Sequence, residues 1–262
     1  MPADSRNLYD LDAVSFRIGA RTIVHPLTLA LRQGRIYGLV GPNGSGKSTL
    51  IKILARQQPA SGGSVAVLGR TLADVPDRAF SRLVAYMPQF TPPADGLTVR
   101  ELVSLGRFPW HGALGRFGGE DAAKVEQALD QTDLQSFASR TVDSLSGGER
   151  QRAWLAMMLA QDTRCLLLDE PTSALDVAHQ VEILALVRDL SRRREMGVVV
   201  VLHDINMAAR YCDEIIALRG GEMVARGTRD EILDGAVLDR IYGLPMGIVP
   251  HPLTGAPIGY VL

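Results

Sequence analysis

Hydrophobic residues follow different patterns in different parts of the 262-residue chain. From about residue 8 to 31 apolar and polar positions alternate, which predicts antiparallel strands. Short strand-like runs, several of them wholly apolar, lie at residues 35–40, 63–68, 83–87, 165–168 and 198–202. Leu and Ile at helical spacing follow the first of these runs, from residue 47 to about 56. The mixture of strand and helix signals predicts an α/β fold.

The middle of the chain lacks the strand pattern. A proline-rich loop at residues 90–96 marks a change of subdomain, and the spacing over 98–161 is helical. Thr98 can cap the first helix, with Glu101 as its capping-box partner. The segment 106–117 is too rich in Gly and aromatic residues for a regular element. Its aromatic side chains either pack as a small satellite core or form an exposed patch for a partner.

The last third of the chain returns to the α/β pattern. It begins with a long amphipathic helix, whose apolar face we expect to comprise Val177, Val181, Leu184, Val187 and Leu190. Residues 214–218 and 222–226 flank two glycines and predict a hairpin. Four prolines after about Leu244 predict an irregular tail packed on the surface.

Composition limits the functions that the chain can have alone. Its net charge of -1 gives no electrostatic reason to expect a nucleic-acid or anionic-lipid surface. The two cysteines, Cys165 and Cys212, suggest neither a disulfide framework nor a metal site, which fits a reducing cytosol. No signal peptide is visible, and apolar runs such as Val198–Leu202 are far shorter than the roughly 20 residues that span a bilayer. Work at a membrane would therefore need another chain.

A glycine-rich loop between the first buried strand and its helix matches the pattern G-x-x-x-x-G-K-[ST] of phosphate-binding loops. Its residues are Gly41, Pro42, Asn43, Gly44, Ser45, Gly46, Lys47, Ser48 and Thr49. The glycines let backbone N–H groups approach an anion, and the helix points its positive end at the phosphates. Lys47 can reach the β- and γ-phosphates, and the Ser48 hydroxyl can bind Mg²⁺.

Two carboxylates follow the apolar run at residues 165–168. Taken alone, Asp169 and Glu170 could simply be a strand that ends in acidic residues. A phosphate loop in the same chain favours a functional interpretation, because a nucleotide's Mg²⁺ needs a carboxylate and hydrolysis needs an oriented water. We assign Asp169 to the metal and Glu170 to the water.

A second anion-binding helix start lies at Leu145–Gln151, where a serine and two glycines precede a helix. The chain thus has two such starts but only one lysine-bearing loop. We infer that the second start completes the nucleotide pocket of another copy of the chain.

Together these motifs resemble the ATP-binding-cassette ATPases over residues 8–245. In the family's order they are Walker A (Gly41–Thr49), the Q-loop glutamine (Gln89), the signature (Leu145–Gln151), Walker B (Cys165–Glu170), the D-loop (Ser173–Asp176) and the switch histidine (His203). The resemblance implies a P-loop NTPase cassette with a mixed core sheet, an N-terminal antiparallel β subdomain and a helical subdomain. Residues 8–89 and 162–245 would form the RecA-like core with its β subdomain, 90–161 the helical subdomain, and 246–262 a C-terminal tail.

The resemblance also implies roles for the site residues. Two copies would form a head-to-tail dimer around two ATP molecules, and the Lys47 loop of one copy would face Ser146, Gly147, Gly148 and Glu149 of the other. Ser48, Gln89 and Asp169 would serve Mg²⁺. Glu170 would be the general base or position the water, His203 would contact the γ-phosphate, and Asp176 would lie at the dimer seam. His25, His111, His179 and His251 keep an ordinary structural interpretation.

Recognition of the base is less defined by the residues. Many family members stack adenine on an aromatic residue at the position of Ile18 here. Phe16 would share its face on a regular strand, so either Phe16 substitutes or Ile18 makes a weaker apolar contact.

Three stretches, 106–117, 161–165 and 202–211, resemble the ATPase subunits of bacterial iron-chelate importers, most closely the ferric hydroxamate (ferrichrome) branch. The ATPase subunits of haem, cobalamin or catecholate-siderophore importers share much of this sequence and are alternatives. The implied partners are a polytopic permease and, indirectly, a periplasmic or surface substrate-binding protein, at the cytoplasmic face of the inner membrane. A different-class alternative is an ATP-driven switch acting on nucleic acid. That class expects long coiled-coil heptads between the motifs, and only about a hundred residues separate them here.

Overall fold

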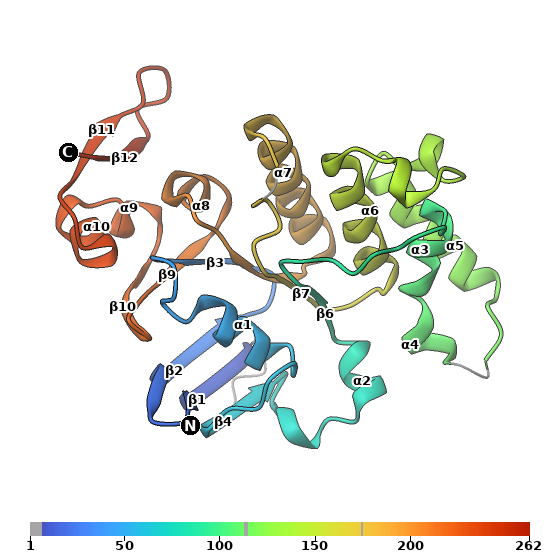
Figure 1. Cartoon of the computed structure of the whole chain (residues 1–262), viewed down its shortest axis with the longest axis horizontal. Helices are drawn as coiled ribbons and strands as arrows, with labels where there is room; N and C mark the ends of the chain where they lie inside the picture. The colour runs from blue at the N-terminus through green and yellow to red at the C-terminus, as the bar shows by residue number, and fades with distance from the viewer. Residues whose placement is uncertain (1–6, 113–114, 174) are drawn as a thin grey trace.

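The computed structural model describes residues 7–112, 115–173 and 175–262. Ala174 of the predicted D-loop and residues 113–114 of the aromatic segment lie outside the described residues. The described chain is built from two larger β-sheets, a group of helices at one end and a C-terminal pair of strands (Figure 1).

A six-stranded mixed sheet forms the centre of the molecule, in the order β10-β9-β3-β8-β7-β6. Its strands are β3 (Ile36–Val40), β6 (Val84–Met87), β7 (Cys165–Leu168), β8 (Gly197–Val201), β9 (Glu214–Arg219) and β10 (Glu222–Gly227). The strands from β9 to β6 are parallel, and β10 pairs with β9 as the predicted antiparallel hairpin. Both faces of the sheet are covered, so β3, β7 and β8 are buried at every position. This explains their continuous apolar sequences.

The predicted antiparallel strands form a separate four-stranded sheet, in the order β2-β1-β4-β5. They are β1 (Asn7–Ile18), β2 (Arg21–Arg32), β4 (Gly62–Val67) and β5 (Arg70–Thr71). One face packs with helix α1 (Lys47–Leu54) against the central sheet, in a core that contains Tyr9, Leu29, Leu50 and Leu167. This packing fixes the phosphate loop, which connects β3 to α1.

The middle of the chain is helical, as predicted. Short helices η1 (Leu72–Asp74) and α2 (Asp77–Ser81) precede β6, and α3 (Val99–Leu105), α4 (Phe108–His111), α5 (Gly119–Gln131), η2 (Gln135–Phe137), η3 (Val142–Ser144) and α6 (Gly147–Ala160) follow it. Thr98 and Glu101 form the expected capping box at the start of α3.

The expectation of no regular element at 106–117 was wrong for its first half, because α4 forms one helical turn with a proline in its first positions. Trp110 lies in this turn and is held in place. Its indole N–H donates to the carbonyl of Gln161, and the guanidinium groups of Arg82 and Arg107 lie over its ring. Phe108 and Phe117 are about half exposed. Trp110 is therefore engaged within the chain, whereas Phe108 and Phe117 leave apolar surface exposed, and a partner on that surface stays a prediction.

The C-terminal third contains α7 (Val177–Arg194), α8 (Ile205–Tyr211), α9 (Arg229–Ile232), α10 (Gly235–Tyr242), β11 (Met246–Pro250) and β12 (Pro257–Val261). Two expectations fail here. Val177 is 69% exposed, because it is the first residue of α7 and precedes the part of the helix that packs on the sheet. The tail is regular, because β11 and β12 pair as a hairpin whose prolines, Pro250 and Pro257, face each other at the end beside the turn. In the described part of the chain, no helix has both the length and the apolar character needed to cross a membrane.

Candidate functional site

The phosphate loop has a backbone that only glycine can follow at two positions. Gly41 and Gly46 have φ of 135° and 98°, in the left-handed region. A Cβ atom on Gly41 would lie 1.9 Å from the carbonyl oxygen of Leu218, and one on Gly46 would lie 2.9 Å from that of Ile23. The loop is therefore clamped between β9 and β2, and its shape is set before any ligand binds.

Lys47 is folded over this loop. Its Nζ atom donates to the carbonyl oxygens of Gly41 (2.8 Å) and Pro42 (2.9 Å). Burial lowers the pKa of Lys47, against the opposing effect of the Glu170 and Asp169 carboxylates. In the same loop, the buried hydroxyl of Ser45 has no hydrogen-bond partner. A positive charge and an unsatisfied polar atom in a glycine cradle fit a bound phosphate group.

Ser48 and Asp169 meet beside the loop. The Ser48 hydroxyl donates to Oδ1 of Asp169 at 2.9 Å, joining the start of α1 to the end of β7. Asp169 is only 1% exposed, and burial raises its pKa despite the Ser48 hydrogen bond. These hydroxyl and carboxylate oxygens are suitable ligands for Mg²⁺. No group of three His, Cys, Asp or Glu side chains among the described residues could hold a metal alone, so a metal here needs ligands from a bound phosphate.

Gln89, Glu170 and His203 converge on one another. Each follows one of the adjacent parallel strands β6, β7 and β8, so all three lie at the edge where α/β sheets bind ligands. Nε2 of Gln89 donates to Oε2 of Glu170 at 2.6 Å, and Nε2 of His203 lies 2.7 Å from the same oxygen. Glu170 has a φ of 52°, unusual outside glycine and typical of a constrained functional residue.

A cavity of about 420 Å³ opens beside this group and is lined by Glu170, Gln180, His203 and Met207, among others. It places solvent next to the Glu170 carboxylate, where an attacking water would need a base. Gln89, Glu170 and His203, to which the resemblance assigned roles at the Mg²⁺, the water and the γ-phosphate, thus lie together.

The second anion-binding helix start is capped from within the chain. Ser146 is the N-cap of α6, and the Glu149 carboxylate accepts hydrogen bonds from its backbone N–H (2.8 Å) and hydroxyl (2.7 Å). These bonds, the hydroxyl's first, lower the pKa of Glu149. Among the described residues, no hydrogen bond or ion pair connects Ser146 through Glu149 with the phosphate loop. Glu149, which the sequence assigned to phosphate binding in trans, here serves the cap.

Asp176 caps α7, and sequence reasoning missed its partner, His179. Oδ1 of Asp176 accepts from the backbone N–H of His179 at 2.9 Å and lies 2.8 Å from its ring Nδ1. The available signal was an aspartate followed three positions later by a histidine at a helix start.

The two candidates for base contact differ in exposure. Phe16 is partly buried and packs against the core between the two sheets, whereas Ile18 is 64% exposed. A register shift between Phe16 and Arg17 interrupts the alternation of the strand, so the two side chains need not share a face. Ile18 is therefore the available apolar surface.

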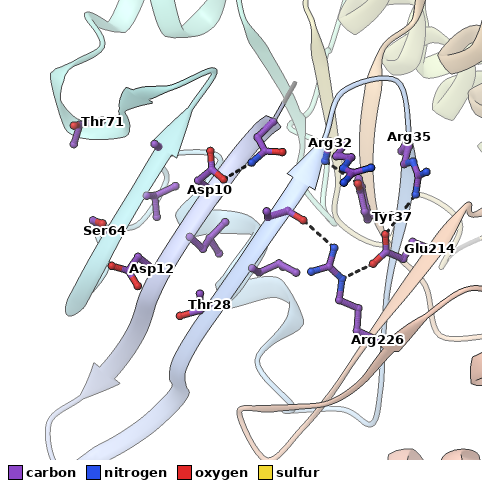
Figure 2. Close-up of a pocket in the computed structure, with 16 residues that line it drawn as sticks. Asp10, Asp12, Thr28, Arg32, Arg35, Tyr37, Ser64, Thr71, Glu214 and Arg226 are labelled. Carbon is purple, nitrogen blue, oxygen red and sulfur yellow. Dashed lines mark hydrogen bonds and ion pairs between the residues drawn. The ribbon is translucent and has the colours of Figure 1, made fainter. Parts of the chain in front are cut away.

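A larger cavity of about 710 Å³ lies away from the phosphate loop (Figure 2). Residues of β1, β2 and β4 line it, together with Tyr37 of β3, Glu214 of β9 and Arg226 of β10. Glu214 there is paired with Arg226 and lies 3.8 Å from Arg35, while Arg226 also donates to the carbonyl of Ala30. No phosphate-loop residue lines this cavity, so it is separate from the site described above.

Comparison with known proteins agrees with this geometry. Residues 24–173 match the family model described as ABC transporter. The chain is 43% identical to the achromobactin transport ATP-binding protein of Dickeya dadantii, over 91% of this chain and 89% of that one. It is 38% identical to the iron(3+)-hydroxamate import ATP-binding protein of Bacillus subtilis (96% and 94% covered), and 43% identical to the hemin import ATP-binding protein of Streptomyces coelicolor (91% and 84% covered).

Solved structures show the same fold. A putative metal-chelate type ABC transporter in an inward-facing conformation superposes with a TM-score of 0.85 at 27% identity, covering 98% of this chain and 97% of that one. A dimeric ATP-binding cassette in a post-hydrolysis state with ADP and Pi superposes with a TM-score of 0.73 at 29% identity, covering 84% and 98%. The fold, the site and these relatives lead to one conclusion: the chain belongs to the ABC transporter family, as an ATP-binding subunit that hydrolyses ATP.

Proposed function

We propose that this chain powers the import of a ferric siderophore through a separate membrane permease, by hydrolysing ATP in sites shared between two copies. The observation that carries the catalytic part is the convergence of Gln89, Glu170 and His203 beside the Lys47 loop. The importing role is supported by relatives whose names assign them to achromobactin, hydroxamate and hemin transport.

The phosphate loop and Lys47 would bind the β- and γ-phosphates of ATP. Ser48, Asp169 and Gln89 would hold Mg²⁺, which when bound neutralises charge on the phosphates. Glu170 would accept the proton of the attacking water, with His203 toward the γ-phosphate. Gln89 and His203 both contact Oε2 of Glu170, so the second carboxylate oxygen, Oε1, would accept from the attacking water.

The second copy would complete each site with Ser146, Gly147 and Gly148 of its signature, and with Glu149 if its carboxylate leaves the cap. The exposed hydrogen bonds at Ser146 and the dimeric state of a solved relative support this arrangement. Asp176, exposed at the start of α7, would lie at the seam.

A permease would dock on the side of the helical subdomain. Phe90, directly after Gln89, is 82% exposed, and Phe108 of α4 is 54% exposed. Trp110 is engaged within the chain, so we assign docking to Phe108 and anchoring to Trp110. Phe108→Ala should then reduce transport and permease binding without lowering thermal stability, whereas Trp110→Ala should lower the melting temperature. Normal permease binding by Phe108→Ala would contradict this assignment.

The cargo is a finer proposal. We assign a ferric hydroxamate of the ferrichrome type, with haem, cobalamin and catecholate siderophores as the alternatives. No residue of this chain needs to contact the cargo, so the test is genetic. A strain lacking this chain should fail to grow on ferrichrome as its iron source, and the wild-type chain, but not Lys47→Ala, should restore growth. Failure on haem, cobalamin or a catecholate siderophore alone would reassign the cargo, and normal growth on all four would contradict the importing role.

The chain would act at the cytoplasmic face of the inner membrane, held there by the permease, with a periplasmic or surface binding protein supplying the cargo. The nucleic-acid alternative finds no supporting feature in the described structure.

A further inference from the structure

A histidine with no role in the predicted site packs against the signature helix. His179 lies in the first turn of α7, three residues after Asp176. Oδ1 of Asp176 forms hydrogen bonds with both the backbone N–H of His179 (2.9 Å) and the ring nitrogen Nδ1 of His179 (2.8 Å). These hydrogen bonds, the backbone's first, lower the pKa of Asp176, so the carboxylate is ionised and accepts a hydrogen bond from the Nδ1–H group of His179. The orientation of the imidazole is therefore fixed.

The fixed ring lies directly on Gly148. A Cβ atom built on Gly148 would lie 2.3 Å from Cδ2 of His179 and 2.9 Å from Nε2, so no larger residue fits without moving the ring. At the preceding glycine, Cδ2 of Leu175 lies 3.7 Å from a Cβ atom built on Gly147. The D-loop side of the chain thus packs on both glycines of the signature.

We propose that His179 is a positioning residue for ATP hydrolysis, which couples the D-loop to the signature within one copy. Asp176 orients the imidazole, and the imidazole sets the position of Gly148 and of the first turn of α6. The two segments then move as one unit when a second copy closes on them. This inference rests on the proposed completion of the site in trans.

The physical reason is that glycine has no side chain to fix its own distance from α7. Without the imidazole, a gap would remain beside Gly148, and the start of α6 could shift into it. A displacement of about 1 Å at a phosphate-binding backbone is enough to cost up to roughly 10²-fold in rate.

Three substitutions of His179 separate the contribution of its packing on Gly148 from that of its hydrogen bond to Asp176. Asparagine places atoms where Nδ1 and Cδ2 of the ring lie and keeps a donor for Asp176. Leucine fills the same two positions without a donor, and alanine fills neither. We expect kcat of the full chain to fall about tenfold in His179→Ala and by an intermediate factor in His179→Leu, and to stay within about twofold in His179→Asn. KM for ATP should change little, because the Lys47 loop is untouched.

The matched control is His251→Ala. His251 is another half-buried histidine held by local hydrogen bonds, since its Nδ1 accepts from the backbone of Leu253, but it lies in the turn between β11 and β12. The His251→Ala substitution should leave kcat unchanged. Melting temperatures of all four variants separate a kinetic effect from loss of fold.

A double substitution tests whether the two residues act as a unit. If Asp176 acts only through the imidazole, adding Asp176→Ala to His179→Ala should lower kcat no further. A wild-type kcat for His179→Ala, or independent multiplication of the two effects, would overturn the inference. Ser146→Arg measured in parallel keeps the two proposals apart. An inactive Ser146→Arg variant beside a fully active His179→Ala variant would contradict only the role of His179. A fully active Ser146→Arg variant would contradict the completion of the site in trans.

Discussion

The two anion-binding helix starts of this chain differ in how complete they are. At the start of α1, the loop is clamped by its glycines, Lys47 lies over it, and the Ser48–Asp169 pair is already formed. At the start of α6, Ser146 is exposed and its hydrogen bonds are taken by the chain's own Glu149. The first start has a lysine, a hydroxyl–carboxylate pair and the Glu170 carboxylate nearby within one chain, whereas the described residues at the second provide a helix N-terminus, the Ser146 hydroxyl and two glycines.

In the proposed shared site, the first start would bind the nucleotide and the second, from another copy, would respond to it. A buried lysine and a buried aspartate are costly to keep without a ligand, so the first half is prepared for one. The start of α6 costs little free energy, because the Ser146–Glu149 capping box satisfies its backbone N–H groups. We therefore expect changes in the first half to affect chemistry and binding, and changes in the second to affect turnover alone.

The largest effect should come from Glu170→Gln. It removes the only carboxylate that both Gln89 and His203 contact, so turnover should fall by at least roughly 10²-fold. ATP binding should persist, because the phosphate loop is unchanged. Steady-state hydrolysis and equilibrium binding of a fluorescent ATP analogue measure the two effects. Unchanged hydrolysis would remove Glu170 from its assigned role.

Ser146→Arg tests the other half. A long cation in place of the N-cap hydroxyl should lower turnover by roughly 10²-fold, comparable to the loss of one stabilising donor. Binding of ATP to the single chain should stay normal, because no described hydrogen bond connects Ser146 with the loop. If binding weakened in parallel with turnover, the two halves would not be separable within one chain.

Asp169→Asn measures how much stability the buried Asp169 carboxylate costs the fold. Burial raises the pKa of Asp169, so above that raised pKa the ionised carboxylate destabilises the fold, and this penalty shrinks as pH falls from the raised pKa toward the unfolded-state pKa. Asparagine keeps an acceptor for Ser48 without the charge. The melting temperature at neutral pH should therefore rise, by about 2–4 °C for each kcal/mol relieved.

The sign of the pH dependence is the check on this prediction. The advantage of Asp169→Asn should shrink as pH falls through the raised pKa, and an advantage that grew on acidification would contradict the burial argument. Asp189→Asn, at an exposed aspartate paired with Arg193, is the control and should change little at any pH.

The smallest effect should follow Glu149→Gln. Glutamine also completes a capping box, so the melting temperature and turnover should stay near those of the wild type. Glu149→Ala removes only the reciprocal half of the capping box, because the Ser146 hydroxyl still accepts from the backbone N–H of residue 149, so the melting temperature should fall only slightly. A large loss of turnover in Glu149→Gln, measured in the same hydrolysis assay, would show that the carboxylate itself is needed in the site.

The sequence predicted which site residues lie together better than it predicted how they pack. Strand ends place Gln89, Glu170 and His203 together, and continuous apolar runs reveal such strands. The contact of His179 with Gly148 could not be predicted, because it joins two helices through side-chain packing that no local pattern encodes. The hairpin of the tail was missed for a related reason. Its prolines looked like strand breakers, but they lie beside the turn, where a strand tolerates them.

The most direct test of the account is to mix two inactive variants, Lys47→Ala and Ser146→Arg. If the signature of one copy completes the loop of the other, a mixed dimer has one site with both lesions and one intact site. Random mixing should then restore up to about a quarter of the wild-type sites, with ATP hydrolysis clearly above that of either variant. If each chain instead completed its own site, every site would carry a lesion. The mixture would then hydrolyse ATP no faster than the sum of its parts, which would contradict the account.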